Sequence, residues 1–182
     1  MKNSVRNLCT VSVFTALMCI IAPLSIPIGP VPITLATLMV YLISALFPVK
    51  LAPLIISLYV ALGALGLPVF SSFSSGLTIL LGPTGGFIFS YIVASVLESL
   101  LIGIFKEKKW MYPIVMVLVT VVIYALGSAW FMYYMKGAYS FQKTMMVCVV
   151  PFLLGDSIKI GIASVLSIRF RPVVALQLSR GR

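Results

Sequence analysis

Six apolar segments, separated by short polar or proline- and glycine-rich connections, determine what this chain is able to fold into. A helix needs about 20 predominantly apolar residues to cross the ~30 Å hydrocarbon core of a bilayer. Charged residues make up only 9% of the sequence, and most of them lie between the segments; soluble domains contain about 25%. The pattern predicts one all-α integral membrane domain over residues 1–182, with six transmembrane helices at about 8–24, 33–47, 51–65, 84–105, 113–134 and 145–168.

The positive charges predict the orientation of these segments, because the cytoplasmic connections of membrane proteins carry an excess of Lys and Arg. A cytoplasmic N-terminus and six spans place these bases on the cytoplasmic side: Lys2, Arg6, Lys50, Lys106, Lys108, Lys109, Arg169, Arg171, Arg180 and Arg182. Only Lys136 and Lys143 then lie outside. Both termini are therefore expected in the cytoplasm, and the connections after the first, third and fifth segments on the external side.

The composition excludes several classes of function. The net charge of +10 invites a nucleic-acid partner, but the bases cluster at the ends of apolar segments and form no basic face. The absence of His excludes a Ser-His-Asp or Cys-His arrangement, and three acidic residues offer few metal ligands. The cysteines, Cys9, Cys19 and Cys148, are expected to be small buried hydrophobes. We therefore expect no catalytic residue, no metal and no nucleic acid.

The first apolar segment follows Lys2 and Arg6, as the apolar core of a signal peptide does. Five further apolar segments come after it, which favours an uncleaved first span. Within this span, Ser12 and Ala16 are four residues apart, and such a pair of small residues lets another helix approach closely. That neighbour is either another helix of this chain or a partner protein.

The second and third segments are short. Residues 33–47 are 15 residues long, which gives a helix of about 22 Å. Either the two segments are short spans around a thinned, water-accessible cavity, or they form a re-entrant hairpin; the first reading puts Lys50 with the other cytoplasmic bases and is favoured. Four prolines within residues 23–32 exclude a helix there and predict a rigid extended connection, after which Ile33 and Thr34 are expected to begin the second helix.

Residues 66–76 and 82–86 are rich in glycine, serine and proline, which is typical of turns. Irregular backbone near the core of a membrane protein is tolerated only where protein buries it or where it lines a cavity. These stretches are therefore either ordinary external loops or part of a cavity wall. Residues 82–86 lack the Gly-Lys-Ser/Thr ending of a phosphate-binding loop.

Asp156 and Lys159 lie inside the last apolar segment, which is expected to be one helix with Pro151 in its first turns. A spacing of three residues puts both side chains on one face of a helix. Intramembrane charges are costly and mark functional sites by default. The pair is either a structural ion pair or the polar anchor of an apolar ligand pocket; the second is favoured, since a buried ion pair adds little stability. Glu98, the other acid in an apolar segment, is assigned no role.

Four stretches, in order and at matching intervals, resemble the BioY family of biotin transport proteins. They are residues 29–35 (Gly-Pro-Val-Pro-Ile-Thr-Leu), 59–70 (Tyr-Val-Ala-Leu-Gly-Ala-Leu-Gly-Leu-Pro-Val-Phe), 82–87 (Gly-Pro-Thr-Gly-Gly-Phe) and 155–159 (Gly-Asp-Ser-Ile-Lys). Two departures stand out. The loop after the second stretch is usually richer in glycine than Ser71–Ser75 here, and only Ser12 and Ala16 match the family's Ala-xxx-Ala pattern in the first helix.

The resemblance implies the substrate-binding S component of an energy-coupling-factor (ECF) transporter. Such a protein sits among the lipids of the bacterial cytoplasmic membrane, captures biotin from outside and delivers it to the cytoplasm. Its partners are a transmembrane coupling subunit and two ATPase subunits, which use the ATP, so that no cofactor is expected in this chain. Ser12 and Ala16 would face the coupling subunit.

The resemblance also implies roles for site residues beneath external loops that cap a ligand cavity. Asp156 would accept hydrogen bonds from the ureido N–H groups of biotin. Lys159 would donate to the ligand, either to the ureido carbonyl or to the carboxylate. The expected lining residues are Thr34, Tyr41, Ser75, Gly76 and Thr84.

Three other readings compete with this one. The chain is alternatively an S component for another vitamin, such as thiamine or riboflavin, with the same fold. A small membrane enzyme would have to rest on Asp156 and Lys159 alone. A structural subunit without a ligand would leave that pair as an ion pair within the last helix.

Overall fold

The computed structural model describes residues 2–27, 30–105 and 108–179. The chain is helical apart from one short β-ribbon, and its elements are α1 (Lys2–Ile21), β1 (Ser25–Ile26), β2 (Ile33–Thr34), α2 (Ala36–Leu46), α3 (Ala52–Ala64), a 3-10 turn η1 (Ser71–Phe73), α4 (Leu77–Leu80), α5 (Gly85–Ile104), α6 (Met111–Tyr134), α7 (Phe141–Cys148) and α8 (Val150–Ser179). Gly29 of the first family motif and the bases Lys106, Arg180 and Arg182 lie outside the described residues, as does the side chain of Lys2.

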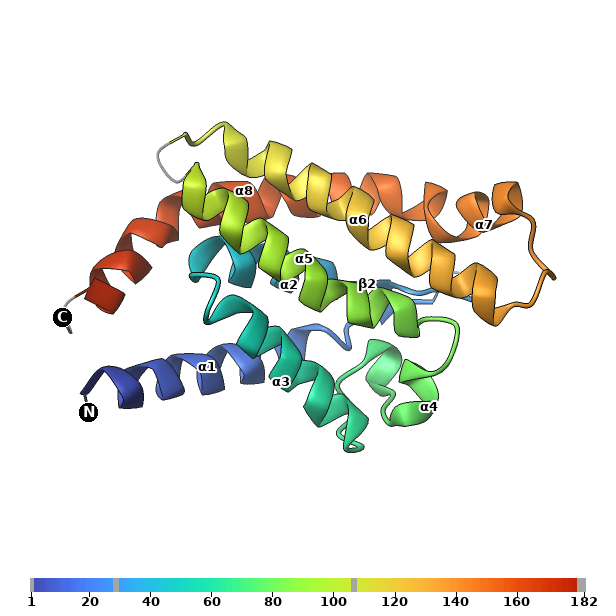
Figure 1. Ribbon diagram of the computed structural model, residues 1–182, viewed down its shortest axis with the longest axis horizontal. Helices are drawn as coiled ribbons and strands as arrows, with labels where there is room; N and C mark the ends of the chain where they lie inside the picture. Colours follow the sequence, from blue (N-terminus) through green and yellow to red (C-terminus); the bar gives the residue numbers. More distant parts are fainter. Residues whose placement is uncertain (1, 28–29, 106–107, 180–182) are drawn as a thin grey trace.

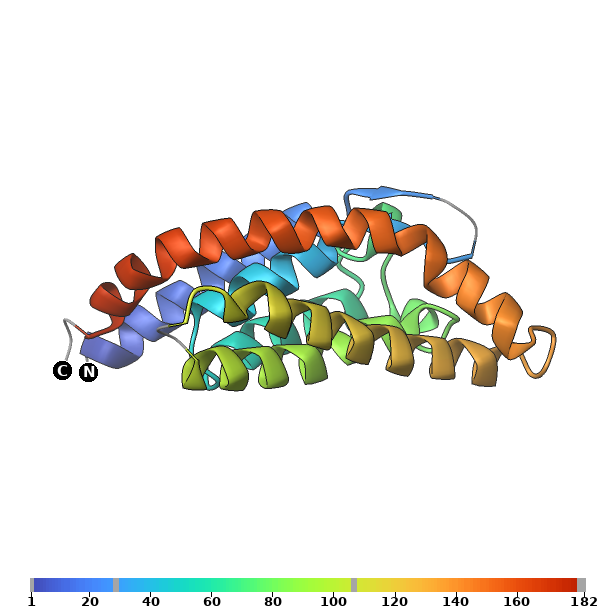
Figure 2. The same ribbon diagram turned by 90° about the horizontal axis from the view of Figure 1, so that it is seen from above.

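The long helices run lengthwise, and the two termini lie at the same end of the molecule (Figure 1). The turn between α6 and α7 lies at the opposite end, and β1 and β2 are displaced toward that end (Figure 2). α5 packs along α6, and α2 contacts both α5 and α8. The core between them is aliphatic and aromatic, with Tyr41, Ile43 and Ile55 almost completely buried.

Three helical stretches of the described chain are long and apolar enough to cross a membrane: Gly85–Ile104, Met111–Tyr134 and Phe141–Leu176. Three shorter helices are also apolar: Val5–Ile21, Ala36–Leu46 and Ala52–Ala64. The prediction of apolar helices in an all-α protein is therefore confirmed. The helices α2, α3, α5 and α6 begin and end close to the residues that hydropathy indicates.

The described residues of the proline-rich connection form no helix, as predicted, but only β1 within it is a strand, and residues 30–31 bend. The end of the connection was wrongly assigned. Ile33 and Thr34 do not begin the second helix; they form β2, which pairs antiparallel with β1. The Thr34 hydroxyl accepts the N–H of Ala36 at 3.2 Å, and the helix begins there. The hydroxyl thereby satisfies a backbone donor at the helix start that has no partner within the helix.

The last apolar segment is not one helix, contrary to the prediction for residues 145–168. It divides at Val149 into α7 and α8, and α8 continues to Ser179. Pro151 explains the break, because it has no N–H to donate to the preceding turn and its ring crowds that turn. The N-terminus of α7 is capped by Ser140, whose hydroxyl accepts the N–H of Lys143 at 3.3 Å.

The glycine- and serine-rich connection after α3 folds back over the β-ribbon. The N–H of Ser72 donates to the Pro23 carbonyl at 3.0 Å and to the Ser25 hydroxyl at 2.9 Å. The N–H of Gly76 donates to the Gly63 carbonyl at 2.8 Å. Gly76 has φ +91°, a conformation that side chains with a Cβ rarely adopt. The two bonds of Ser72 join the two connections into one cover, in the half of the molecule away from the termini (Figure 2).

Candidate ligand-binding site

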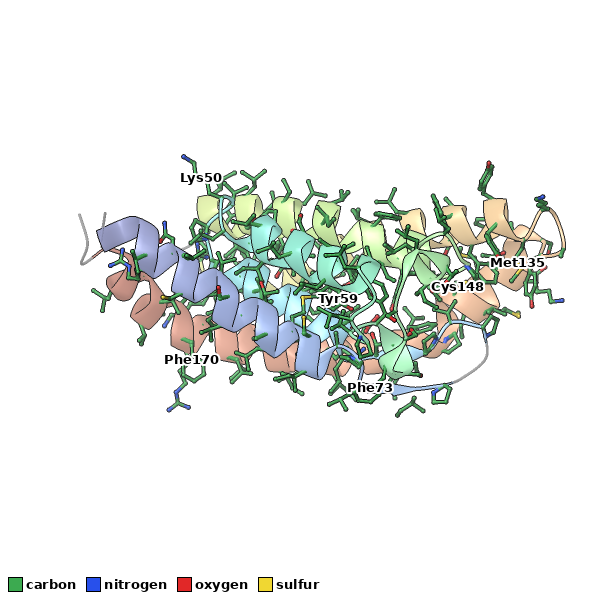
Figure 3. The ribbon with its side chains drawn as sticks, turned by 90° about the horizontal axis from the view of Figure 1, so that it is seen from below. Lys50, Tyr59, Phe73, Met135, Cys148 and Phe170 are labelled. Carbon is green, nitrogen blue, oxygen red and sulfur yellow. The ribbon has the colours of Figure 1, made fainter. Side chains whose placement is uncertain are left out.

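A cavity of about 610 Å³, its mouth included, lies beneath this cover. Its walls come from the first turns of α2 and α5, the middle of α6, the start of α8, and the connections around β2 and η1. Tyr59 and Cys148, which both line it, are labelled in Figure 3, on either side of the region that the η1 loop covers.

Asp156 and Lys159 meet in this wall. The Lys159 ammonium Nζ lies 2.8 Å from Oδ1 of Asp156, one turn earlier on α8. Both residues are buried, with 3% of Asp156 and 7% of Lys159 exposed. The structure therefore brings the two predicted charges together as a hydrogen-bonded ion pair at a cavity, where neither charge is left without a counter-charge.

Polar groups of α2 and its N-terminal connection complete the surroundings of Lys159. Its Nζ donates to the Thr34 carbonyl at 2.7 Å and to the Thr37 hydroxyl at 3.0 Å. The Thr37 hydroxyl in turn donates to Asp156 Oδ1 at 3.1 Å. An ammonium has three N–H groups, so each of them has a partner. The ion pair is thereby held between two helices that are more than one hundred residues apart in the sequence.

The other oxygen of the carboxylate is bound from α6. The Tyr124 hydroxyl donates to Asp156 Oδ2 at 2.6 Å. Because a carboxylate oxygen accepts two hydrogen bonds, Oδ2 keeps one acceptor position for a further donor. The site therefore offers a hydrogen-bond acceptor beside a cation.

Aromatic and aliphatic side chains form most of the remaining wall: Ala22, Val31, Pro32, Tyr59, Phe70, Phe87, Ile88, Tyr91, Ile123 and Phe152. Thr84 and Ser71 add hydroxyl groups. A mostly apolar cavity with a few convergent polar groups suits a small ligand that has an apolar body and a polar end. Within the described residues no three His, Cys, Asp or Glu side chains form a group that could hold a metal ion.

The predicted lining residues divide into two groups. Thr34 and Thr84 line the cavity, together with Asp156 and Lys159. Tyr41 does not: it is fully buried below, and its hydroxyl pairs with that of Thr120 at 2.6 Å. Ser75 and Gly76 belong to the covering connection but are not part of the cavity wall.

Sequence reasoning missed Thr37, Tyr59, Tyr91 and Tyr124 as lining residues. Thr37 carried a weak signal, since it lies one helical turn after Thr34. Tyr59 carried one as well, since it begins the second family stretch. Tyr91 and Tyr124 carried none, because apolar helices present aromatic residues on every face. Ser12 and Ala16 are exposed on α1, away from the cavity.

Glu98 lies outside this wall. It is completely buried on α5, and among the described residues neither carboxyl oxygen has a hydrogen-bond partner. Of the two acids that lie within apolar helices, Asp156 lines the cavity and Glu98 does not.

The arrangement of helices matches a known class of membrane protein. A structure described as "Crystal structure at 2.1 A of the S-component for biotin from an ECF-type ABC transporter" superposes with a TM-score of 0.86, covering 94% of this chain and 93% of that one at 24% sequence identity. The fold is therefore that of an S component. The BioY family model matches residues 1–176, and the chain belongs to the BioY family.

Two relatives match nearly end to end. The "Biotin transporter BioY" of Thermotoga maritima is 38% identical over 172 residues, which are 92% of this chain and 97% of the relative. The "Probable biotin transporter BioY" of Pyrococcus horikoshii is 34% identical over 166 residues, which are 91% and 96% of the two chains. The family resemblance inferred from the four motifs is confirmed, and these relatives are named as transporters rather than as enzymes.

Proposed function

We propose that this protein is the biotin-binding S component of an ECF-type vitamin importer. The observation that carries the proposal is the Asp156–Lys159 pair at the wall of a mostly apolar cavity. Membership of the BioY family and the names of its relatives support biotin as the ligand. Nothing in the cavity favours thiamine or riboflavin over biotin.

The chemistry of biotin complements the cavity. Its ureido ring carries two N–H donors and one carbonyl acceptor, and the free acceptor position on Asp156 Oδ2 suits one of these donors. Lys159 donates to the ligand by exchanging one of its present bonds, to Thr34 or Thr37, for the ureido carbonyl or the carboxylate. The thioether ring and the valeryl chain then lie against the aromatic walls, with Tyr59 and Tyr91 among them.

We place the protein in the bacterial cytoplasmic membrane as one domain with six spans and both termini in the cytoplasm. Two observations support this topology. The termini lie at one end of the molecule, and Lys50 and Phe170, which is flanked by Arg169 and Arg171, lie toward that end, whereas Met135 lies at the other (Figures 1 and 3). The cover formed by the connections after α1 and α3 then faces outward and caps the cavity.

The partners follow from the same proposal: a transmembrane coupling subunit and two ATPase subunits that bind and hydrolyse ATP. We propose that α1 docks on the coupling subunit. Ser12 and Ala16 are exposed on a face of α1 that also exposes Leu8 and Ile20, at 67% each. Small residues on this face allow a second helix to approach closely.

The ligand is tested by thermal unfolding and tryptophan fluorescence of the purified protein with biotin, thiamine and riboflavin. We expect stabilisation by biotin alone, and we expect Asp156→Asn and Lys159→Ala each to weaken biotin binding about 10- to 100-fold, the range for hydrogen bonds to charged groups. Stabilisation by another vitamin would keep the fold and replace the substrate. Full biotin affinity in Asp156→Asn would contradict the anchor.

A further inference from the structure

Tyr124 separates the ligand cavity from a second hollow. This hollow is a groove of about 1230 Å³, its open mouth included, between α6 and the α7–α8 segment. Its wall is almost entirely apolar, with Val121, Ala125, Met145 and Leu153 among its residues. Of the residues that the structure describes, only Tyr124 and Asp156 line both the groove and the cavity. The hydrogen bond between these two side chains therefore lies in the partition between the two spaces.

The bonding of Asp156 shows what the Tyr124 hydroxyl does there. Oδ1 is bound by Lys159 from α8 and by Thr37 from α2. Among the described residues, the hydrogen-bond donor to Oδ2 is the Tyr124 hydroxyl. Without it, only the two hydrogen bonds to Oδ1 would restrain rotation of the carboxylate about its Cβ–Cγ bond.

We infer that Tyr124 is a positioning residue for ligand binding: its hydroxyl holds Oδ2 of Asp156 toward the cavity and closes the cavity against the groove. This inference rests on the proposed function, in which Asp156 accepts an N–H of biotin. Tyr124 and the ligand donor share Oδ2, one at each of its two acceptor positions. The tyrosine acts through Asp156.

The first arm of the test measures biotin affinity in lipid nanodiscs for Tyr124→Phe, which removes only the hydroxyl. The matched control is Tyr112→Phe on the same helix. Tyr112 is buried, whereas Tyr124 is half-buried, and Tyr112 accepts a hydrogen bond from Arg171 at 2.9 Å but lines neither space. We expect biotin affinity to fall about 10-fold in Tyr124→Phe, as for the loss of one bond to a charged group, and to stay within twofold of wild type in Tyr112→Phe.

A double-mutant cycle distinguishes positioning from a general effect on packing. In an Asp156→Asn background, Tyr124→Phe is expected to change the remaining affinity less than twofold, because the group it positions has already been altered. An equal loss in both backgrounds would overturn the inference. Unchanged biotin affinity in the single Tyr124→Phe variant would overturn it as well.

The second arm needs no biotin and tests the partition directly. Cys148 lines the cavity and is completely buried. With Cys9 and Cys19 replaced by Ser, we expect N-ethylmaleimide, which partitions into the bilayer, to modify Cys148 several-fold faster in Tyr124→Phe than in wild type or Tyr112→Phe. Equal rates would overturn the partition. If the wild type does not respond to biotin but Cys148 reacts faster in Tyr124→Phe, the proposed ligand fails and the partition stands.

Discussion

At the scale of single residues, the cavity is built around a charge pair whose members depend on each other. Oδ1 of Asp156 receives hydrogen bonds from Lys159 and Thr37, and Lys159 also binds the Thr34 carbonyl. Removing one member of a buried pair leaves an uncompensated charge, whereas removing both charges is often neutral. This asymmetry separates the structural contribution of the pair from its contribution to binding.

Lys159→Met should therefore destabilise the protein by about 3–5 kcal/mol, since the Asp156 carboxylate loses its counter-charge. The double variant Asp156→Asn/Lys159→Met should recover most of that stability, because the neutral amide accepts at one position and donates at the other, and the Tyr124 and Thr37 hydroxyls can each act as donor or acceptor. It should nevertheless fail to bind biotin. Thermal unfolding in detergent measures the first effect, and equilibrium binding measures the second. If Lys159→Met were as stable as wild type, the ion pair would not contribute to stability as predicted.

At the scale of elements, α5 and α6 pack closely enough to shape the cavity wall. Phe87 of α5 lines the cavity and lies over Gly127 of α6. A Cβ added at Gly127 would lie 2.6 Å from Cγ of Phe87, well inside van der Waals contact. The glycine thus allows the aromatic ring of one helix to lie against the backbone of the other.

Gly127→Ala is accordingly expected to displace Phe87, to lower stability by about 1–3 kcal/mol through overpacking, and to weaken biotin binding. Gly103→Ala is the matched control, because Gly103 is a helical glycine of the neighbouring α5 and a Cβ there would meet no atom within 4 Å. That control should be neutral or stabilising by up to ~1 kcal/mol, the difference between Gly and Ala in a helix. Equal unfolding midpoints for the two variants would refute the close packing.

The elements also show where local sequence rules were insufficient. Hydropathy located α2, α3, α5 and α6, since each is an apolar run bounded by Gly, Pro or charge. It did not locate the break at Val149, because the residues on both sides are equally apolar and Pro is tolerated in the first turn of a helix. It also assigned Ile33 and Thr34 to a helix, whereas their pairing with β1 is a tertiary contact.

At the scale of the whole molecule, the proposed membrane topology depends on which connections lie at the same end of the molecule. The loop before α6 and the loop after it lie at opposite ends of the molecule (Figure 1). α6 contains 24 residues, enough to cross a ~30 Å apolar core. A crossing by α6 therefore puts residues 108–110 and 136–140 on opposite sides of the membrane.

Cysteine labelling in intact cells tests this topology in a background free of the native cysteines. Both Lys109→Cys and Ala138→Cys lie at exposed positions outside the cavity. A membrane-impermeant maleimide should label Ala138→Cys in intact cells, and it should label Lys109→Cys only after the cells are permeabilised. The reverse pattern would invert the proposed orientation. Labelling of both from the same side would mean that α6 does not cross.

The sequence by itself determined the class of protein and the position of the Asp156–Lys159 pair. Apolar runs, charges at their ends, and the spacing of Asp156 and Lys159 are local properties, because the helical repeat alone puts residues three apart on one face. The four short motifs were sufficient to indicate the BioY family. Three of them lie wholly or partly in connections rich in Gly and Pro, and the fourth carries the charge pair inside α8.

Only the tertiary structure decided which other side chains contact Asp156 and Lys159. It brought Thr37 and Tyr124 onto Asp156 from α2 and α6, and it turned Tyr41 away from the cavity toward Thr120. The rotation of each apolar helix about its axis depends on packing against its neighbours, and helices that are apolar on every face carry no local signal for that rotation. The walls of the site were therefore settled by contacts between helices that are distant in the sequence.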